Sequence, residues 1–204
     1  MVSPPKAVIF DLGKVLLDFD YGITVARILE RCRVSAEELR ELIDQSPLHH
    51  RYEKGLISTD QFFREVQVKT GYEGSKEEFV AAFADIFTAI PAMVELHARL
   101  CERRIPTYIF SNTNELAIRH VTRQFPFFNE FNGYVYSYES HSMKPDTRLY
   151  EAVERCVGFG GDALLYLDDR LENVTAGEAH GWRARLHESP EQSIEIVREA
   201  GLLE

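Results

Sequence analysis

The stretch Ala7-Val8-Ile9-Phe10-Asp11-Leu12-Gly13 decides the fold. Its first four residues are apolar without alternation, which predicts a short strand buried on both faces, as in a parallel sheet. The aspartate ends that strand and opens a polar turn. Two later stretches repeat the design, because residues 107–110 run into Ser111-Asn112 and residues 163–167 run into Asp168-Asp169. The sequence therefore predicts three buried strands that each end at polar residues.

Helical periodicity fills the segments between these strands, with proline or a capping residue at several of the helix starts. Weaker strand candidates lie at residues 134–136 and 182–186. Strand and helix alternate from residue 91 onward, which is typical of a parallel sheet covered on both faces. We therefore predict an α/β fold with a Rossmann-like parallel sheet and helices on both faces. The predicted helices span residues 91–104, 115–124, 146–157, 171–180 and a last segment from 189.

The segment between residues 21 and 89 breaks this alternation. Capping signals at Ser35, Ser58 and Ser75 each precede an amphipathic helix, and the pattern indicates helices here and no strand. We expect a helical bundle inserted after the first strand. The predicted organisation is an α/β core of residues 1–18 and 90–204 and a helical insert of residues 19–89.

Composition excludes several function classes. The chain has 204 residues, 33 acidic against 23 basic side chains and a net charge of −10, so affinity for nucleic acid or an anionic membrane is not expected. Three widely spaced cysteines predict reduced thiols and no disulfide framework or structural zinc site. Neither an export signal nor a membrane-spanning apolar run is apparent. We expect a cytoplasmic monomer or homodimer.

Polar side chains gather at the carboxyl ends of the predicted strands. Asp11, Ser111 and the Asp168-Asp169 pair each follow a buried strand, and ligands of open parallel sheets bind at this edge. Clustered carboxylates are unfavourable unless a cation joins them. An oxygen-only set suits Mg²⁺, which commonly takes one or two carboxylates and a substrate phosphate. Lys144, between the fourth strand candidate and the next helix, can neutralise both phosphate and carboxylates. Taken singly, an aspartate or serine after a strand is more often the N-cap of the next helix, and a lone lysine before proline is more often a solvated loop residue.

The order Asp11, Ser111, Lys144 and Asp168-Asp169 resembles the four motifs of the haloacid dehalogenase (HAD) superfamily over nearly the whole chain. The insert after the first motif is similar to that superfamily's helical cap of the first type. Phe-Asp-Leu-Gly, Ser-Asn-Thr-Asn and Met-Lys-Pro resemble the branch that includes glucose-1-phosphate phosphatases. The resemblance implies a Mg²⁺-dependent phosphohydrolase acting on a small phosphorylated metabolite, with a sugar phosphate as one candidate.

Carried over to this chain, the resemblance makes Asp11 the nucleophile, which attacks phosphorus and forms an aspartyl-phosphate. It implies that the Asp11 carboxylate, the Gly13 carbonyl and Asp169 hold Mg²⁺. Asp168 is implied as a residue behind these ligands, against the lysine, and Asn173 as the holder of a water of the metal. A carboxylate is an adequate nucleophile toward phosphate once cations screen the repulsion between the two anions.

The phosphoryl group has its own implied partners. The resemblance assigns its oxygens to the Ser111 hydroxyl and the Asn112 backbone amide. It assigns to Lys144 the task of offsetting charge on the nucleophile and the phosphate. Asp11, Ser111 and Lys144 are therefore the implied catalytic residues.

One position departs from the family pattern. Phosphatases of the superfamily usually carry a second aspartate two residues after the nucleophile, as general acid and base, and here that position is Gly13. General acid catalysis matters less for a weakly basic leaving group, so we expect a preference for anomeric or acyl phosphates over simple alkyl phosphates. Asp18 or Asp20 is a possible substitute acid, although both also fit solvated turn positions.

Two other functions stay open on the sequence. The dehalogenase branch also lacks the second aspartate and attacks carbon without a metal, which the Asp168-Asp169 pair argues against. A protein that binds a phosphorylated metabolite with little turnover is the other alternative. Within the insert, residues 49–54 (His-His-Arg-Tyr-Glu-Lys) fit either a substrate-facing surface or an exposed helix end.

Overall fold

A computed structural model of the protein describes residues 3–44 and 46–204. Its main sheet is parallel, with the strand order β5-β4-β1-β6-β7. β1 lies at the centre, and all four of its residues are fully buried. This arrangement confirms the predicted α/β fold. The strands are β1 (Ala7–Phe10), β2 (Leu17–Phe19), β3 (Phe87–Ala89), β4 (Thr107–Ser111), β5 (Gly133–Tyr136), β6 (Leu164–Asp168) and β7 (Arg183–Leu186).

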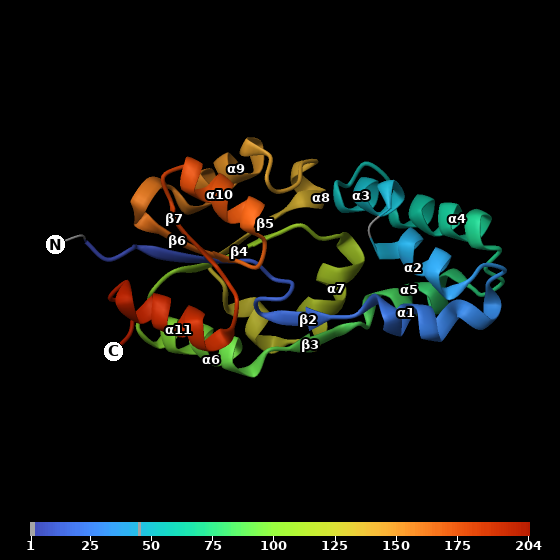
Figure 1. The fold of residues 1–204 in the computed structure, drawn as a ribbon, viewed down its shortest axis with the longest axis horizontal. Coiled ribbons are helices and arrows are strands. Elements are labelled where there is room, and N and C mark those ends of the chain that lie inside the picture. The colour runs from blue at the N-terminus through green and yellow to red at the C-terminus, as the bar shows by residue number, and fades with distance from the viewer. Residues whose placement is uncertain (1–2, 45) are drawn as a thin grey trace.

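Helices cover both faces of this sheet (Figure 1). One face packs against α6, α7 and α11 through residues such as Leu96, Val121 and Val197. The other packs against α9 and α10 through residues such as Tyr150 and Val174. Successive side chains of β1 enter opposite layers, which explains why the strand is apolar at every position. These helices are α6 (Pro91–Glu102), α7 (Glu115–Gln124), α8 (Ser137–Ser140), α9 (Thr147–Val157), α10 (Leu171–Ala179) and α11 (Pro190–Glu199), with short 3₁₀ turns at Pro126–Glu130 and Gly161–Ala163.

The helical insert has a hydrophobic core of its own, rich in aromatic side chains. Tyr52 stacks on Phe62 with ring centroids 4.5 Å apart, and Phe79 stacks on Phe83. Leu116 of α7 joins this cluster and connects it to the α/β core. The insert holds α1 (Tyr21–Ile28), a 3₁₀ turn (Leu29–Arg31), α2 (Ala36–Asp44), α3 (Pro47–Glu53), α4 (Thr59–Thr70) and α5 (Lys76–Ala84).

The capping signals read from the sequence are present as capping boxes. The Ser58 and Ser75 side chains each accept a hydrogen bond from the third helical N–H, and the Gln61 and Glu78 side chains accept one from the backbone N–H of the capping residue. Ser35 makes the same exchange with Glu38. No helix within residues 3–44 or 46–204 is long and apolar enough to cross a bilayer.

One expectation for the insert was wrong, because residues 21–89 do contain a strand. β2 and β3 pair antiparallel, with Leu17 opposite Ala89 and Phe19 opposite Phe87. Strands of three residues carry no readable periodicity, and this pair joins segments about seventy residues apart. Both predicted boundaries of the insert lie in or beside this two-stranded ribbon, so its chain crossings run side by side at the edge of the core (Figure 1).

Candidate active site

A cavity of about 300 Å³ lies at the carboxyl ends of β1 and β6. The core contributes Asp11, Asn112, Lys144 and Asp169 to its walls, and Gly13 and Asn173 also line it. The helical insert contributes a further part of its walls. The strand ends thus bring together most of the residues that the sequence singled out, because parallel strands all end at the same edge of the sheet.

Lys144 lies between two buried aspartates. Its ammonium group is 2.6 Å from Asp168 Oδ2 and 3.0 Å from Asp11 Oδ1, and it donates to the carbonyl of Phe110 at 2.9 Å. Only 1% of the side chain is exposed. Burial opposes its charge, but attraction to Asp11 and Asp168 outweighs burial and raises the pKa of Lys144. The lysine therefore stays charged inside the protein.

The negative charge of the Asp168 carboxylate is balanced by the donors around it. Besides Lys144, its carboxylate accepts hydrogen bonds from the Arg170 N–H at 2.9 Å, the Asn173 side chain at 2.9 Å and the Tyr166 hydroxyl. Burial acts to raise its pKa, but Lys144 overrides burial, and the pKa of Asp168 is lowered. All of its acceptor capacity is used within the protein, as expected for a group behind the reacting ones.

Asp11 and Asp169 are less well compensated. Burial, followed by repulsion from Asp168 and Asp169, raises the pKa of Asp11 despite the nearby lysine. Burial and repulsion from Asp168 likewise raise the pKa of Asp169. Carboxylate oxygens of Asp11, Asp168 and Asp169 all lie within 4.8 Å of one another. One lysine does not balance three close carboxylates, so this donor set fits a hard divalent cation, with Asp11 and Asp169 as the residues that need it.

The loop after β4 is fixed against the lysine loop. Asn112 accepts from the Lys144 N–H at 2.8 Å and donates to its carbonyl at 3.1 Å. Ser111 is buried at the end of β4, where its hydroxyl is 3.4 Å from the Asn112 carbonyl. Asn112 lines the cavity, and Ser111 is not among the residues that line it. The two predicted phosphate-binding residues thus lie at different depths.

Gly13 lacks room for the aspartate that the family pattern places there. A Cβ atom at this position would lie 2.8 Å from Cε1 of Phe19. The Phe19 ring is in turn held by Lys14, whose ammonium lies 4.7 Å from the ring centroid, and by edge contact with Tyr21. Phe19 therefore occupies the space next to the position where an acid would stand.

Neither substitute acid suggested by the sequence faces the reaction as a proton donor. Asp18 pairs with Lys14 at the surface, and this hydrogen bond lowers the pKa of Asp18, so the group carries no proton near neutral pH. Asp20 is the N-cap of α1 and accepts from the Gly22 N–H at 2.7 Å. Both carboxylates accept hydrogen bonds from nearby backbone N–H groups in the segment that connects the core to the insert.

Polar side chains of the insert also line the cavity. The sequence had placed them only within residues 49–54, without separating one residue from another. His49, His50 and Glu53 of α3 line the cavity together with Tyr21 of α1. His49 Nε2 is 3.1 Å from the Tyr21 hydroxyl and 3.8 Å from Glu53 Oε1, and burial lowers the pKa of His49 to about 4. The substrate-facing interpretation of residues 49–54 agrees with this geometry, although the sequence could not distinguish Glu53 from its neighbours.

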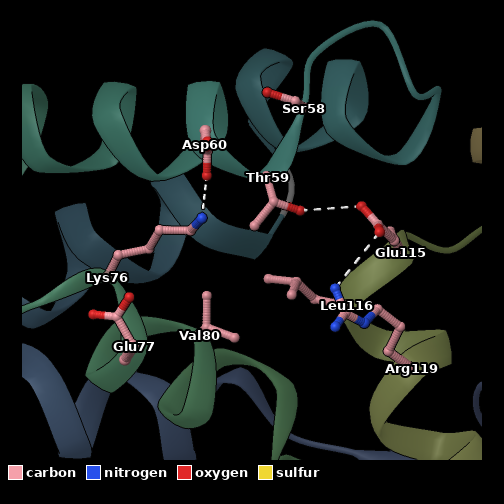
Figure 2. A pocket seen from close by; sticks show the side chains of 9 residues that line it. All are labelled: Ser58, Thr59, Asp60, Lys76, Glu77, Val80, Glu115, Leu116 and Arg119. Atoms are coloured by element: carbon pink, nitrogen blue, oxygen red, sulfur yellow. Dashed lines mark hydrogen bonds and ion pairs between the residues drawn. The ribbon is translucent and has the colours of Figure 1, made fainter.

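A second cavity, of about 400 Å³, lies where α4 and α5 face α7 and contains none of the predicted site residues (Figure 2). Thr59 donates to Glu115 at 3.4 Å across it, and Arg119 pairs with Glu115 at 3.7 Å. Exposed ion pairs of this kind contribute at most about 1 kcal/mol. This cavity lies at a contact between insert and core, whereas most of the predicted site residues line the first cavity.

An aspartate at the end of a central parallel strand, close to an acidic pair and a buried lysine, is the arrangement that the four motifs of the sequence implied. The family model of the haloacid dehalogenase-like hydrolases matches residues 5–181. The chain belongs to this family, which confirms the resemblance seen in its four motifs.

Two characterised relatives are phosphatases. A sesquiterpene phosphatase of Aspergillus oryzae is 26% identical over 184 residues, covering 89% of each chain. A D-ribitol-5-phosphate phosphatase of Bacteroides thetaiotaomicron is 21% identical, covering 87% of this chain and 89% of the relative. A HAD family enzyme of the same bacterium, solved with magnesium and inorganic phosphate, superposes with a TM-score of 0.77 at 22% identity, over 89% of this chain and 93% of that one.

Proposed function

We propose that this hydrolase is a Mg²⁺-dependent phosphatase that acts on a small phosphorylated metabolite, with a sugar phosphate as one candidate. The observation that carries the proposal is the unequal charge balance of the site. Asp168 is saturated by four donors, whereas Asp11 and Asp169 remain undercompensated. A divalent cation supplies the missing positive charge, and relatives named as phosphatases support the same reaction.

Asp11 is the nucleophile in this proposal. Its backbone N–H is bonded to the carbonyl of Leu167, and its Oδ1 accepts from the Leu12 N–H at 2.7 Å, so one carboxylate oxygen is held and the other is available to attack phosphorus. When bound at Asp11, Asp169 and the Gly13 carbonyl, Mg²⁺ supplies positive charge that offsets the repulsion between nucleophile and phosphate. Lys144 adds a fixed charge on the side of Asp168.

Phosphate binding falls to the loop after β4 and to Lys144. The Asn112 side chain bonds to the backbone N–H and carbonyl of Lys144, which fixes the loop after β4 and preorganises the Asn112 backbone amide for a phosphoryl oxygen. Ser111 at the end of β4 belongs to the same proposal through its hydroxyl. Asn173 orients Asp168 at 2.9 Å and lines the cavity, which fits the holding of a water near the cation.

The alternative of a metal-independent dehalogenase is disfavoured by the same charges. Without a cation, Asp11 next to Asp169 retains a proton more readily than an ordinary aspartate, and a protonated carboxyl is a poor nucleophile. A halide-releasing enzyme needs a nucleophile that stays ionised without metal. Release of chloride from 2-chloropropionate in excess chelator would overturn the proposal.

The test is hydrolysis of p-nitrophenyl phosphate by the native protein and by Asp11→Asn. We expect turnover with Mg²⁺, loss of turnover in excess EDTA, and a fall of about 10³-fold or more in Asp11→Asn. Circular dichroism of the variant controls for folding. A native protein that binds inorganic phosphate yet hydrolyses neither this ester nor any member of a metabolite panel would instead favour the binding-protein alternative.

A further inference from the structure

The proposed reaction needs a proton for the leaving group, and Gly13 cannot provide it. Phe19 fills the adjacent space, with its ring 2.8 Å from where a Cβ would stand. Asp18 and Asp20 are engaged with Lys14 and with the backbone of α1. The core therefore offers no proton donor at the usual place, and the insert is the remaining source.

Glu53, the last residue of α3, lines the same cavity as Asp11, Gly13 and Asp169. Its side chain keeps 15% of its surface exposed. Within residues 3–44 and 46–204, no hydrogen bond reaches its carboxyl group, and His49 Nε2 lies 3.8 Å from its Oε1. A mostly buried carboxyl group that lines the cavity and makes no hydrogen bond to the described residues is free to interact with a bound substrate.

The position of Glu53 relative to the core is fixed by its own backbone. The Ser137 hydroxyl donates to the carbonyl of Glu53 at 2.7 Å and accepts from the Thr113 N–H at 2.9 Å, in the loop that follows β4. Gly55, at φ +62°, allows the chain to approach α8 so closely that a Cβ would lie 2.1 Å from the Tyr138 carbonyl oxygen. The end of α3 is thus seated on the loop that carries the predicted phosphate-binding residues.

The surroundings of Glu53 favour its neutral form. Burial, followed by repulsion from Asp44, raises the pKa of Glu53 to about 8, while Arg170 and Lys144 act in the opposite direction. His49 beside it is neutral, since burial lowers its pKa to about 4. The titratable or charged side chains around this part of the cavity are Tyr21 of α1, Asp44 of α2, His49 and His50 of α3, and Lys144, Asp169 and Arg170 of the core. A group of this kind holds a proton at neutral pH and can release it.

We propose that Glu53, supplied by the helical insert, is the general acid and base of this enzyme and replaces the aspartate missing at position 13. The inference rests on the proposed phosphatase function. As Asp11 forms its bond to phosphorus, the bond from phosphorus to the leaving oxygen breaks, and the Glu53 carboxyl donates its proton to that oxygen. In the second half, Glu53 as carboxylate takes a proton from the water that attacks phosphorus, the Asp11–phosphorus bond breaks, and phosphate leaves.

The experiment compares two esters of similar shape with the Mg²⁺-loaded enzyme. p-Nitrophenyl phosphate has a weakly basic leaving group that needs no proton, and benzyl phosphate has a strongly basic one. The readout is kcat/KM, which reports only the steps up to release of the first product. The variants are Glu53→Gln, which keeps size and neutrality, and Glu41→Gln, an exposed carboxylate on α2, as matched control.

We expect Glu53→Gln to lose about 10²-fold or more on benzyl phosphate and less than tenfold on p-nitrophenyl phosphate, in line with the usual worth of general acid catalysis. Glu41→Gln should leave both values unchanged. Equal losses on both esters would assign Glu53 to substrate placement and overturn the inference. A native enzyme inert toward both esters refutes the proposed phosphatase function itself, which is a separate outcome.

The pH profile of the native enzyme provides a measurement that needs no variant. Because the acid must carry its proton, kcat/KM for benzyl phosphate should fall as pH rises through the raised pKa of Glu53, and this fall should be absent in Glu53→Gln. A native profile that stays flat to pH 9.5 contradicts the inference. The sequence predicted a preference for weakly basic leaving groups because Gly13 provides no acid. If Glu53 is the acid, this preference should appear in Glu53→Gln and not in the native enzyme.

Discussion

Replacement of Lys144 by methionine tests how far one buried cation supports the folded protein. Methionine keeps the length of the side chain and removes the charge. The ammonium group lost is within 3.0 Å of Asp11 and Asp168 and donates to the Phe110 carbonyl, with 1% of the side chain exposed. Removing one partner of a buried ion pair costs about 3–5 kcal/mol, because the remaining charge is left uncompensated.

A loss of about 3–5 kcal/mol is a large share of the ~5–15 kcal/mol that stabilises a typical domain. For about two hundred residues it corresponds to a fall in Tm of roughly 6–20 °C. The effect depends on pH with a definite sign. Lys144 lowers the pKa of Asp168 against the effect of burial, so this pairing stabilises the protein above the ordinary aspartate pKa and is lost as pH falls. The variant should therefore approach the native protein in stability only below pH 3.8, where the native Asp168 takes up its proton.

Urea unfolding in EDTA at pH 7.5 and at pH 3.0 measures this difference. The only tryptophan, Trp182, is 4% exposed in the core beside β6 and reports unfolding by its fluorescence. Lys69→Met, at an exposed lysine of α4, is the matched control and should change stability by less than about 0.5 kcal/mol. A loss below 1 kcal/mol for Lys144→Met at pH 7.5, or one that does not shrink with acid, would refute the reasoning.

Three further predictions concern other parts of the molecule. Gly13→Ala should lower the free energy of unfolding by about 1–3 kcal/mol through overpacking against Phe19, and a smaller penalty in a Phe19→Ala background identifies the clash in urea titrations. Ser58→Ala should cost about 1 kcal/mol in thermal melts because it removes the cap of α4, and an unchanged Tm contradicts this. Mg²⁺ should stabilise the native protein by about 2.7 kcal/mol at a hundredfold excess over its Kd, while Asp169→Asn shows little gain in the same calorimetric scan.

The sequence predicted the central strands well and the edge strands less well, for a physical reason. β1 and β6 have neighbours on both sides and are buried at every position, so apolar runs mark them. β5 and β7 are the edges of the sheet and are partly exposed, and their mixed composition gives only weak periodicity. The β2–β3 ribbon escaped prediction altogether, since three residues per strand carry no pattern.

The site was predictable where topology alone determines it. The acids after β1 and β6 meet because parallel strands share an edge, and Lys144 reaches both Asp11 and Asp168 from the loop before α9. Glu53 was not predictable as a single residue. Its place depends on how the end of α3 seats on Ser137 and on the close approach at Gly55, and neither contact leaves a local pattern in the sequence.

The ribbon of β2 and β3 has a consequence for how the chain folds. β1 and β4 are neighbours in the sheet, yet the helical insert separates them in sequence, and such distant pairings are slow to form. Once Leu17 pairs with Ala89, the effective loop between Phe10 and Thr107 shortens from about 97 residues to about 25. The entropic free-energy cost of closing that loop falls by about 1 kcal/mol. Pairing of β2 with β3 thereby brings β1 and β4 close together before they pair.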